Sequence, residues 1–383
     1  MELGQYNQNS ILLPFITERA NSLILGRPLS GKTELLLNLA LQDIYNGLPV
    51  VFIDTQDSAE ILLKYIPNSR QKDVLYIAPH EQPFALNILA HVPTEQHALY
   101  ASTILRTIKS VWRYNIATPT LDQYWIAGIQ TLLAVPNSNL YSFKRLLTDK
   151  DYRTNLDIKD TLLKDFWKDF EDIKDKDKRQ EVSSTLNKLW QFLFFPAIRN
   201  CLLQSKNRLS FKDKIVIVSL KDSQLGENGR LLGALILSYM YVLSFKGLKT
   251  TLYIDGLDRF GQVPQLFRET GITTVSTLGY LSLLPEDQIA STLATVDQII
   301  AFRSSIADGE RLEAEFNIRP QNTKLHELDP FKALHTKRGL STEIQTVLHT
   351  FSETELSETI KRRCASQYTA PLSVIEKQIR GMV

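Results

Sequence analysis

One short segment has the residue types and spacing of a phosphate-binding loop. The pattern G-x-x-x-x-G-K-T is formed by Gly26, Arg27, Pro28, Leu29, Ser30, Gly31, Lys32 and Thr33. The two glycines let the backbone curl closely around phosphates, because no Cβ stands in the way. Lys32 is expected to reach the β- and γ-phosphates, and the Thr33 hydroxyl is expected to ligate Mg²⁺. The segment therefore predicts a site for a nucleoside triphosphate and Mg²⁺.

The elements around this segment are those that the chemistry requires. The apolar run Ser22–Leu25 comes before it and is typical of a strand, and Glu34–Leu41 follows as a helix. A phosphate then lies at a helix N-terminus, where free N–H groups and the helix dipole favour negative charge. The strand, turn and helix together favour a functional loop over a chance match.

A second part of such a site is an acid at the tip of a neighbouring strand, which holds the water shell of Mg²⁺. The run Thr251–Ile254 is a predicted strand that ends in Asp255. Val50–Ile53 is another, and it ends in Asp54. We expect Asp255 to be the metal-side acid, with Asp54 as its rival.

The order of strands and helices predicts an α/β fold with a mainly parallel sheet. Strand patterns at 22–25, 50–54 and 74–77 place a first part of the core at residues 1–90. Helical patterns alone fill residues 91–208, which predicts an all-α inserted domain. Strands return at 215–220, 251–255, 271–276 and 298–302, so the core resumes at 209–335. A hairpin and helices are expected at 336–383, one helix opening with a capping box at Ser352 and Glu355.

Composition limits the class of protein. The 383 residues carry a net charge of +2, so any nucleic-acid surface has to be a local patch. The two cysteines, Cys201 and Cys364, are far apart, which favours a reducing cytoplasmic location. The most apolar helical run, 231–245, is shorter than a membrane span and is interpreted as a buried core helix. We therefore expect no transmembrane segment and no secretory signal.

Beyond single motifs, their order along the chain resembles the TraD/TraG type of type IV secretion coupling ATPases, within the HerA/FtsK group of DNA translocases. The segments that carry the resemblance are Gly26–Thr33, Leu36–Leu39, Val51–Asp54, Ile66–Pro67, Asp73–Ile77, Leu86–Asn87, Leu146–Asp149, Phe166–Trp167, Pro196–Asn200, Leu225–Glu227 and Tyr253–Asp255. The resemblance implies a RecA-like P-loop NTPase core interrupted by an all-α domain. It also implies ATP as the nucleotide, double-stranded DNA as the partner, and a homo-hexamer or other ring.

The resemblance also assigns roles to single residues. Lys32 and Asp255 correspond to catalytic and metal-binding residues, and Arg268 matches the arginine that such a motor supplies to its neighbour's γ-phosphate. Two positions depart from the pattern. Gly256 stands where a glutamate usually activates water, and Gly279 stands where a glutamine usually senses the γ-phosphate. Asp258 and Asp54 are candidate replacements, and slow or partner-dependent hydrolysis is expected.

Three readings of function follow. The first is an ATP-binding translocase or coupling ATPase that moves or recruits double-stranded DNA in a conjugation-like system, with a membrane-embedded partner. The second is a nucleotide-binding adaptor or switch with weakened hydrolysis, and the third is a virus-type genome-packaging ATPase. Candidate DNA contacts are the basic clusters Lys361–Arg363, Lys332 with Lys337 and Arg338, and Lys206 with Arg208. Each is also explained by an ordinary solvated face.

Overall fold

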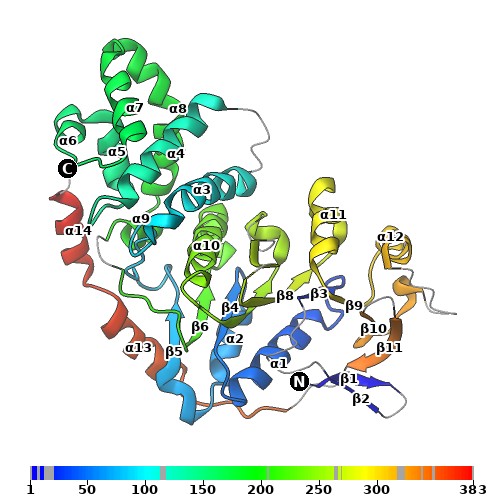
Figure 1. Ribbon diagram of the computed structural model, residues 1–383. Helices are drawn as coiled ribbons and strands as arrows, with labels where there is room; N and C mark the ends of the chain where they lie inside the picture. The colour runs from blue at the N-terminus through cyan, green and yellow to red at the C-terminus, as the bar shows by residue number, and fades with distance from the viewer. Residues whose placement is uncertain are drawn as a thin grey trace. The chain divides into compact units, whose positions relative to one another are not determined.

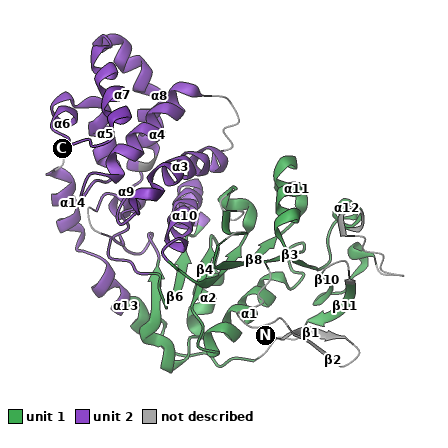
Figure 2. Cartoon of the chain, in the orientation of Figure 1, with its two compact units in different colours: residues 1–77, 211–221, 247–362 green, residues 78–210, 222–246, 363–383 purple. Residues whose placement is uncertain are grey.

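The computed structural model describes residues 2–6, 9–12, 21–112, 118–204, 207–262, 266–268, 270–316, 324–337, 340–346 and 350–381. The chain divides into two compact units (Figure 2). Unit 1 comprises residues 1–77, 211–221 and 247–362, and unit 2 comprises 78–210, 222–246 and 363–383. Each unit is thus built from separate stretches of the sequence.

Unit 1 contains an eleven-stranded sheet in the order β2-β1-β11-β10-β9-β3-β8-β7-β4-β6-β5 (Figure 1). The seven strands from β9 to β5 in this order are parallel, and the remaining pairings are antiparallel. The strands are β1 Glu2–Tyr6, β2 Asn9–Leu12, β3 Ser22–Leu25, β4 Val50–Asp54, β5 Val74–Ile77, β6 Ile215–Ser219, β7 Thr250–Asp255, β8 Ile272–Leu278, β9 Gln298–Ala301, β10 Lys332–Lys337 and β11 Leu340–Thr346.

The parallel strands are buried on both faces, as their continuous apolar sequences predict. Helix α1 (Lys32–Tyr45) packs against β3, β4, β7 and β8, and α2 (Ser58–Lys64) packs against β4, β6 and α1. Unit 1 also contains α11 (Glu286–Thr295), α12 (Ile306–Phe316) and the first half of α13 (Ser357–Tyr368). The predicted α/β class with a mainly parallel sheet is confirmed.

Strand register brings the phosphate-binding loop, Asp255 and its rival Asp54 to one edge of this sheet. Strands β4 and β7 pair so that Asp54 and Asp255 are opposite one another. Strands β3 and β8 pair so that Leu25, which precedes the loop, is opposite Leu278. Strand β8 therefore lies between the loop-bearing strand and the strand that ends in Asp255. The carboxyl ends of parallel strands meet at one edge, which is where α/β proteins bind ligands.

Unit 2 is helical in its described residues. Its helices are α3 His97–Val111, α4 Pro119–Leu133, α5 Leu140–Thr148, α6 Lys150–Thr154, α7 Thr161–Asp172, α8 Asp175–Leu193, α9 Pro196–Leu202, α10 Asp222–Ser244 and α14 Leu372–Arg380, with the second half of α13. The apolar helix expected in the core is α10, and its packing groups it with unit 2, where it contacts α3 and α9. Gly226, at φ 54°, interrupts α10 near its start.

One helix start was wrongly predicted from the sequence. Ser352 and Glu355 form no capping box, because α13 begins only at Ser357. The segment before it is held elsewhere: the Thr354 N–H donates to the Lys64 carbonyl oxygen at 2.7 Å, and its hydroxyl donates to the same oxygen at 3.0 Å. These bonds tie the chain to the end of α2, so the helix starts later.

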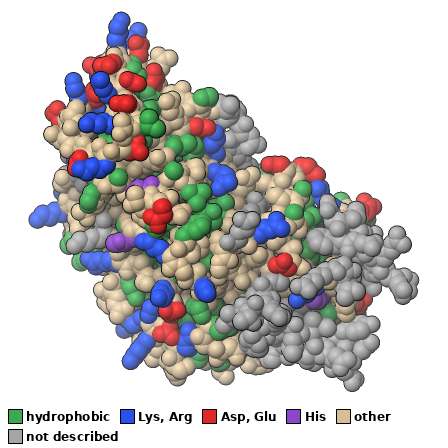
Figure 3. Space-filling view, in the orientation of Figure 1, with side chains coloured by type: hydrophobic (Ala, Val, Ile, Leu, Met, Phe, Trp, Pro, Cys, Tyr) green, Lys and Arg blue, Asp and Glu red, His purple; other side chains and the backbone are tan. Residues whose placement is uncertain are grey.

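Charged side chains of both signs are intermixed on the face seen in Figure 3, notably over the upper helices. Intermixed charges of this kind are typical of solvated helical faces. Among the described residues, we find no helix whose length and apolarity would suffice for a membrane span.

Candidate functional site

The predicted phosphate-binding loop joins β3 to α1 at the carboxyl edge of the sheet. Its first two residues are anchored on both sides: the Gly26 N–H donates to the oxygen of Leu278, the last residue of β8, at 3.0 Å, and the Arg27 N–H donates to the oxygen of Arg303, just after β9, at 3.0 Å. Gly31 precedes the first residue of α1, Lys32. The loop therefore ends at the N-terminus of a 14-residue helix, as an anion site requires.

The two motif glycines are required by geometry. A Cβ at Gly26 would lie 2.5 Å from the Ser30 Oγ and 2.8 Å from the Phe302 Cβ. Gly31 has φ 103°, and a Cβ there would lie 2.8 Å from the Phe331 Cδ1. Residue Leu29 at the loop tip also has a positive φ, 64°, and its side chain is 96% exposed. The loop is thus a tight turn that only glycine permits at two points.

Asp255 lies beside the Thr33 hydroxyl, as the metal-site prediction expects. The Thr33 Oγ1 is 3.5 Å from the Asp255 Oδ1. The same carboxylate oxygen accepts a hydrogen bond from the Thr277 hydroxyl at 2.6 Å, and that hydroxyl accepts the Gly256 N–H at 2.9 Å. A Thr hydroxyl and a carboxylate at this separation suit Mg²⁺, which prefers oxygen ligands and keeps several waters.

Asp54, the rival acid, has a different environment. It is fully buried, and its carboxylate accepts the N–H of Gln56 and, at 2.9 Å, the N–H of Ala59. Burial raises the pKa of Asp54 to about 6, and the nearby charge of Asp255 acts in the same direction, while the two backbone bonds oppose them. Asp54 therefore holds the turn between β4 and α2.

Gly256 has φ 90°, a conformation that side chains rarely adopt. A Cβ there would lie 2.8 Å from both the Cδ and the Nε of Arg259. Arg259, in the short helix after β7, donates a hydrogen bond to the hydroxyl of Thr55, which directly follows β4. Asp258 is partly exposed in the short helix Leu257–Phe260. The backbone conformation after Asp255 therefore favours glycine at position 256.

Gly279 directly follows β8, next to the strand that leads into the loop, so the position expected for a γ-phosphate sensor is at the same edge of the sheet as the loop. Arg268 is exposed and precedes β8 by four residues. The amino-terminal end of β8 is at the opposite edge of the sheet, so the structure does not bring Arg268 to the cluster around Lys32 and Asp255.

The basic clusters proposed for DNA contact have local partners where they are described. Lys361 lies over the Tyr76 ring, 5.2 Å from its centroid. Lys332 pairs with Asp329 at 2.9 Å. The Arg208 guanidinium donates to the Thr369 carbonyl oxygen at 3.2 Å. Arg338 and Lys206 lie outside the described residues. These clusters remain predictions.

Sequence reasoning missed two side chains at this site. Thr277 was not considered, because the predicted strand stopped at Ser276 while β8 continues to Leu278. Phe331 was not among the predicted site residues, but it lies against the loop. A polar residue next to the end of a central strand is a signal that could have found Thr277. No local signal marks Phe331, since it is about 300 residues from the loop.

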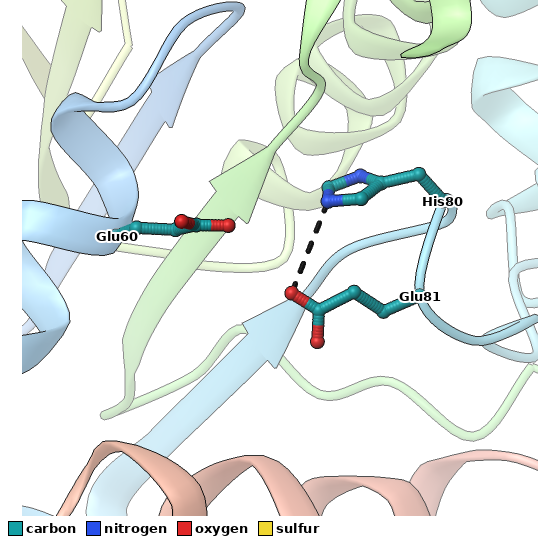
Figure 4. A group of neighbouring side chains, drawn as sticks. All are labelled: Glu60, His80 and Glu81. Atoms are coloured by element: carbon teal, nitrogen blue, oxygen red, sulfur yellow. Dashed lines mark ion pairs between the residues drawn. The ribbon is translucent and has the colours of Figure 1, made fainter.

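Glu60, His80 and Glu81 are acidic and imidazole side chains that are not part of the site around the phosphate-binding loop. His80 and Glu81 of unit 2 form an ion pair at 3.8 Å, drawn in Figure 4. Glu60 of unit 1, also drawn there, pairs with Lys221 at 2.9 Å. Its carboxylate therefore has a partner within its own unit.

The fold is similar to those of two proteins of known structure, TrwB and VirB4. The conjugative coupling protein TrwB, in an unbound form lacking 70 N-terminal residues, matches with a TM-score of 0.66 at 12% identity, over 93% of this chain and 92% of that one. TrwB in complex with ADP and Mg²⁺ matches with a TM-score of 0.60 at 12% identity, over 88% and 87%. VirB4 of Thermoanaerobacter pseudethanolicus matches with a TM-score of 0.64 at 15% identity, over 94% and 98%.

No protein-family model matches the chain. No curated protein sequence matches it either. At identities of 12–15% the similarity concerns the fold, and it extends over nearly the full length of each structure. The resemblance seen in the sequence is confirmed at that level: the chain has the RecA-like P-loop ATPase fold of the coupling protein TrwB and of VirB4.

Proposed function

We propose that the chain is an ATP- and Mg²⁺-binding motor subunit that moves or recruits double-stranded DNA in a conjugation-like transfer system. The observation that carries the proposal is the approach of Thr33 to Asp255, 3.5 Å apart, beside a complete phosphate-binding loop. Lys32 would neutralise the β- and γ-phosphates, and Thr33 with Asp255 would hold Mg²⁺ and its waters. The metal would polarise the γ-phosphate for attack by water.

Two further parts of the proposal concern assembly and location. TrwB is described as a plasmid coupling protein, and it has been crystallised with ADP and Mg²⁺, which supports the same ligands here. We propose a homo-hexamer or other ring in the cytoplasm, recruited by a membrane-embedded partner. In such a ring, the exposed Arg268 would contact the γ-phosphate bound by a neighbouring copy, because it is remote from its own loop.

A second candidate function is a nucleotide-gated adaptor with weakened hydrolysis. It is favoured by Gly256, whose φ of 90° would strain the usual glutamate and whose Cβ position lies against the Arg259 side chain. A missing water-orienting carboxylate costs roughly 10²-fold or more in rate. For the same reason Gly256→Glu would be strained, and it is a poor variant for restoring activity. A virus-type packaging role would use the same site.

The test is ATP binding and turnover by the purified protein, with and without duplex DNA, beside Lys32→Ala. The exposed Lys64, at the end of α2, supplies the matched control Lys64→Ala. Turnover that DNA stimulates and only Lys32→Ala abolishes supports the motor. Tight ATP binding with negligible turnover under both conditions supports the adaptor. Absence of ATP binding by the unmodified protein would refute both.

A further inference from the structure

Phe331 joins the C-terminal hairpin to the phosphate-binding loop. Its N–H donates to the carbonyl oxygen of Ser30 at 3.2 Å. Its Cδ1 and Cε1 atoms are 2.8 and 3.1 Å from the point where Gly31 would carry a Cβ. The aromatic ring therefore lies directly against the backbone of Gly31, at the start of α1.

The conformation of Phe331 is unusual for its residue type. It has φ 64°, and a positive φ is a genuine outlier for a bulky side chain, with a cost of roughly 1–2 kcal/mol. The cost is offset by bonds to its carbonyl oxygen, which accepts the Thr346 N–H at 2.9 Å and the Thr346 hydroxyl at 2.8 Å. Strain that the surroundings maintain in this way is concentrated at functional sites.

The order of the strands gives the direction in which a bound nucleotide would extend. Strands β8 and β7 lie on one side of β3, and they carry Thr277 and Asp255. The metal and the terminal phosphates belong on that side, because Thr33 approaches Asp255 there. Strands β9 and β10 lie on the other side of β3, and Phe331 immediately precedes β10. If the terminal phosphates of a bound nucleotide lie on the β8 side, its sugar and base extend toward the β9 side, where Phe331 lies.

The ring is also accessible. Phe331 is 38% exposed, although one part of it rests on Gly31. A partly exposed aromatic residue beside the phosphate-binding loop suits a flat, aromatic ligand, because bases stack on aromatic side chains whatever their hydrogen-bonding edge.

We infer that Phe331 is a base-binding residue that stacks on the purine of the bound nucleotide. This inference rests on the proposed nucleotide site. Recognition by stacking uses the π-face that adenine and guanine share. The platform therefore accepts both purines, and the choice between them is not made by Phe331.

The experiment compares a ligand that has a base with one that has only phosphates. MgADP and magnesium tripolyphosphate are titrated by calorimetry into the unmodified protein, Phe331→Ala and Phe331→Tyr. We expect Phe331→Ala to weaken MgADP binding roughly 5- to 150-fold and to leave tripolyphosphate binding unchanged. Phe331→Tyr should retain MgADP binding. MgGDP should lose affinity in Phe331→Ala to a similar extent.

A second variant gives a spectroscopic readout. The four native tryptophans, Trp112, Trp125, Trp167 and Trp190, all belong to unit 2. Phe331→Trp thus introduces a tryptophan into unit 1, and MgADP but not tripolyphosphate should quench its fluorescence. Equal losses for both ligands in Phe331→Ala, or unchanged MgADP affinity, would overturn the inference. Failure of the unmodified protein to bind either ligand would instead overturn the proposed function.

Discussion

Thr277 provides the sharpest test of how the metal-side acid is held. Its hydroxyl accepts the Gly256 N–H at 2.9 Å and donates to the Asp255 Oδ1 at 2.6 Å, and the side chain is 1% exposed. Thr277→Val keeps the shape of the side chain and removes both bonds. The Gly256 N–H then has no acceptor, and Asp255 loses the donor that fixes its orientation toward Thr33.

The size of the effect follows from these two losses. An unsatisfied buried N–H costs roughly 1–3 kcal/mol, and Gly256 is only partly buried, so the free energy of unfolding should fall by about 1–2 kcal/mol. For a unit of this size, the midpoint temperature of unfolding should fall by roughly 2–8 °C. Thr277→Ser retains both hydrogen bonds and loses one methyl group, which should cost about 1 kcal/mol or less.

The assay must report on unit 1, because all four native tryptophans are in unit 2. Hydrogen exchange followed by mass spectrometry, over peptides that contain β7 and Gly256, gives that local readout. Exchange should be faster in Thr277→Val than in Thr277→Ser. Titration with MgADP should show weaker binding in Thr277→Val only, because Asp255 is no longer held next to Thr33.

Exchange as slow as in the unmodified protein, together with equal MgADP binding, would contradict the role given to the Thr277 hydroxyl if seen in Thr277→Val. The same holds if Thr277→Ser were the more damaging substitution. In that case the methyl group of Thr277, and not its hydroxyl, would be what β7 requires.

Two further substitutions test the loop and the buried acid. Gly31→Ala places a Cβ 2.8 Å from the Phe331 ring, at a residue whose φ is 103°. We therefore expect loss of MgADP binding and a clear drop in thermal stability. The control is Gly47→Ala, where φ is 84° and no atom lies within 4 Å of the new Cβ, so that only the backbone cost of about 1 kcal/mol applies. Asp54→Asn tests linkage: a folded-state pKa raised from 3.8 to about 6 means that Asp54 favours folding most at low pH and loses this contribution as the pH rises from about 4 to 6. Denaturation from about pH 4 to pH 6 should show the unmodified protein losing about 2 kcal/mol relative to Asp54→Asn, and parallel pH profiles would contradict the raised pKa.

Elements that are formed by neighbouring residues could be predicted from the amino-acid sequence. The strand Ser22–Leu25, the glycine loop and the start of α1 are contiguous, and each is encoded by neighbouring residues whose propensities agree. The buried apolar runs that end in Asp54 and Asp255 are readable for the same reason. Hydrophobic periodicity also separates the helical stretch after residue 91 from the strand-bearing core. The α/β class followed from these patterns.

The tertiary structure alone decided what lies beside the loop. Pairing of β8 with β3 and β7 brings Thr277 to Asp255, and pairing of β10 with β9 brings Phe331 to Gly31. Neither neighbour is marked locally, because strand pairing joins Thr277 to Asp255 across 22 positions and Phe331 to Gly31 across 300. The late start of α13 has the same cause, since long-range bonds from Thr354 outweigh a local capping pattern. Propensity acts over a few residues, whereas a binding site is completed by contacts that only the folded sheet creates.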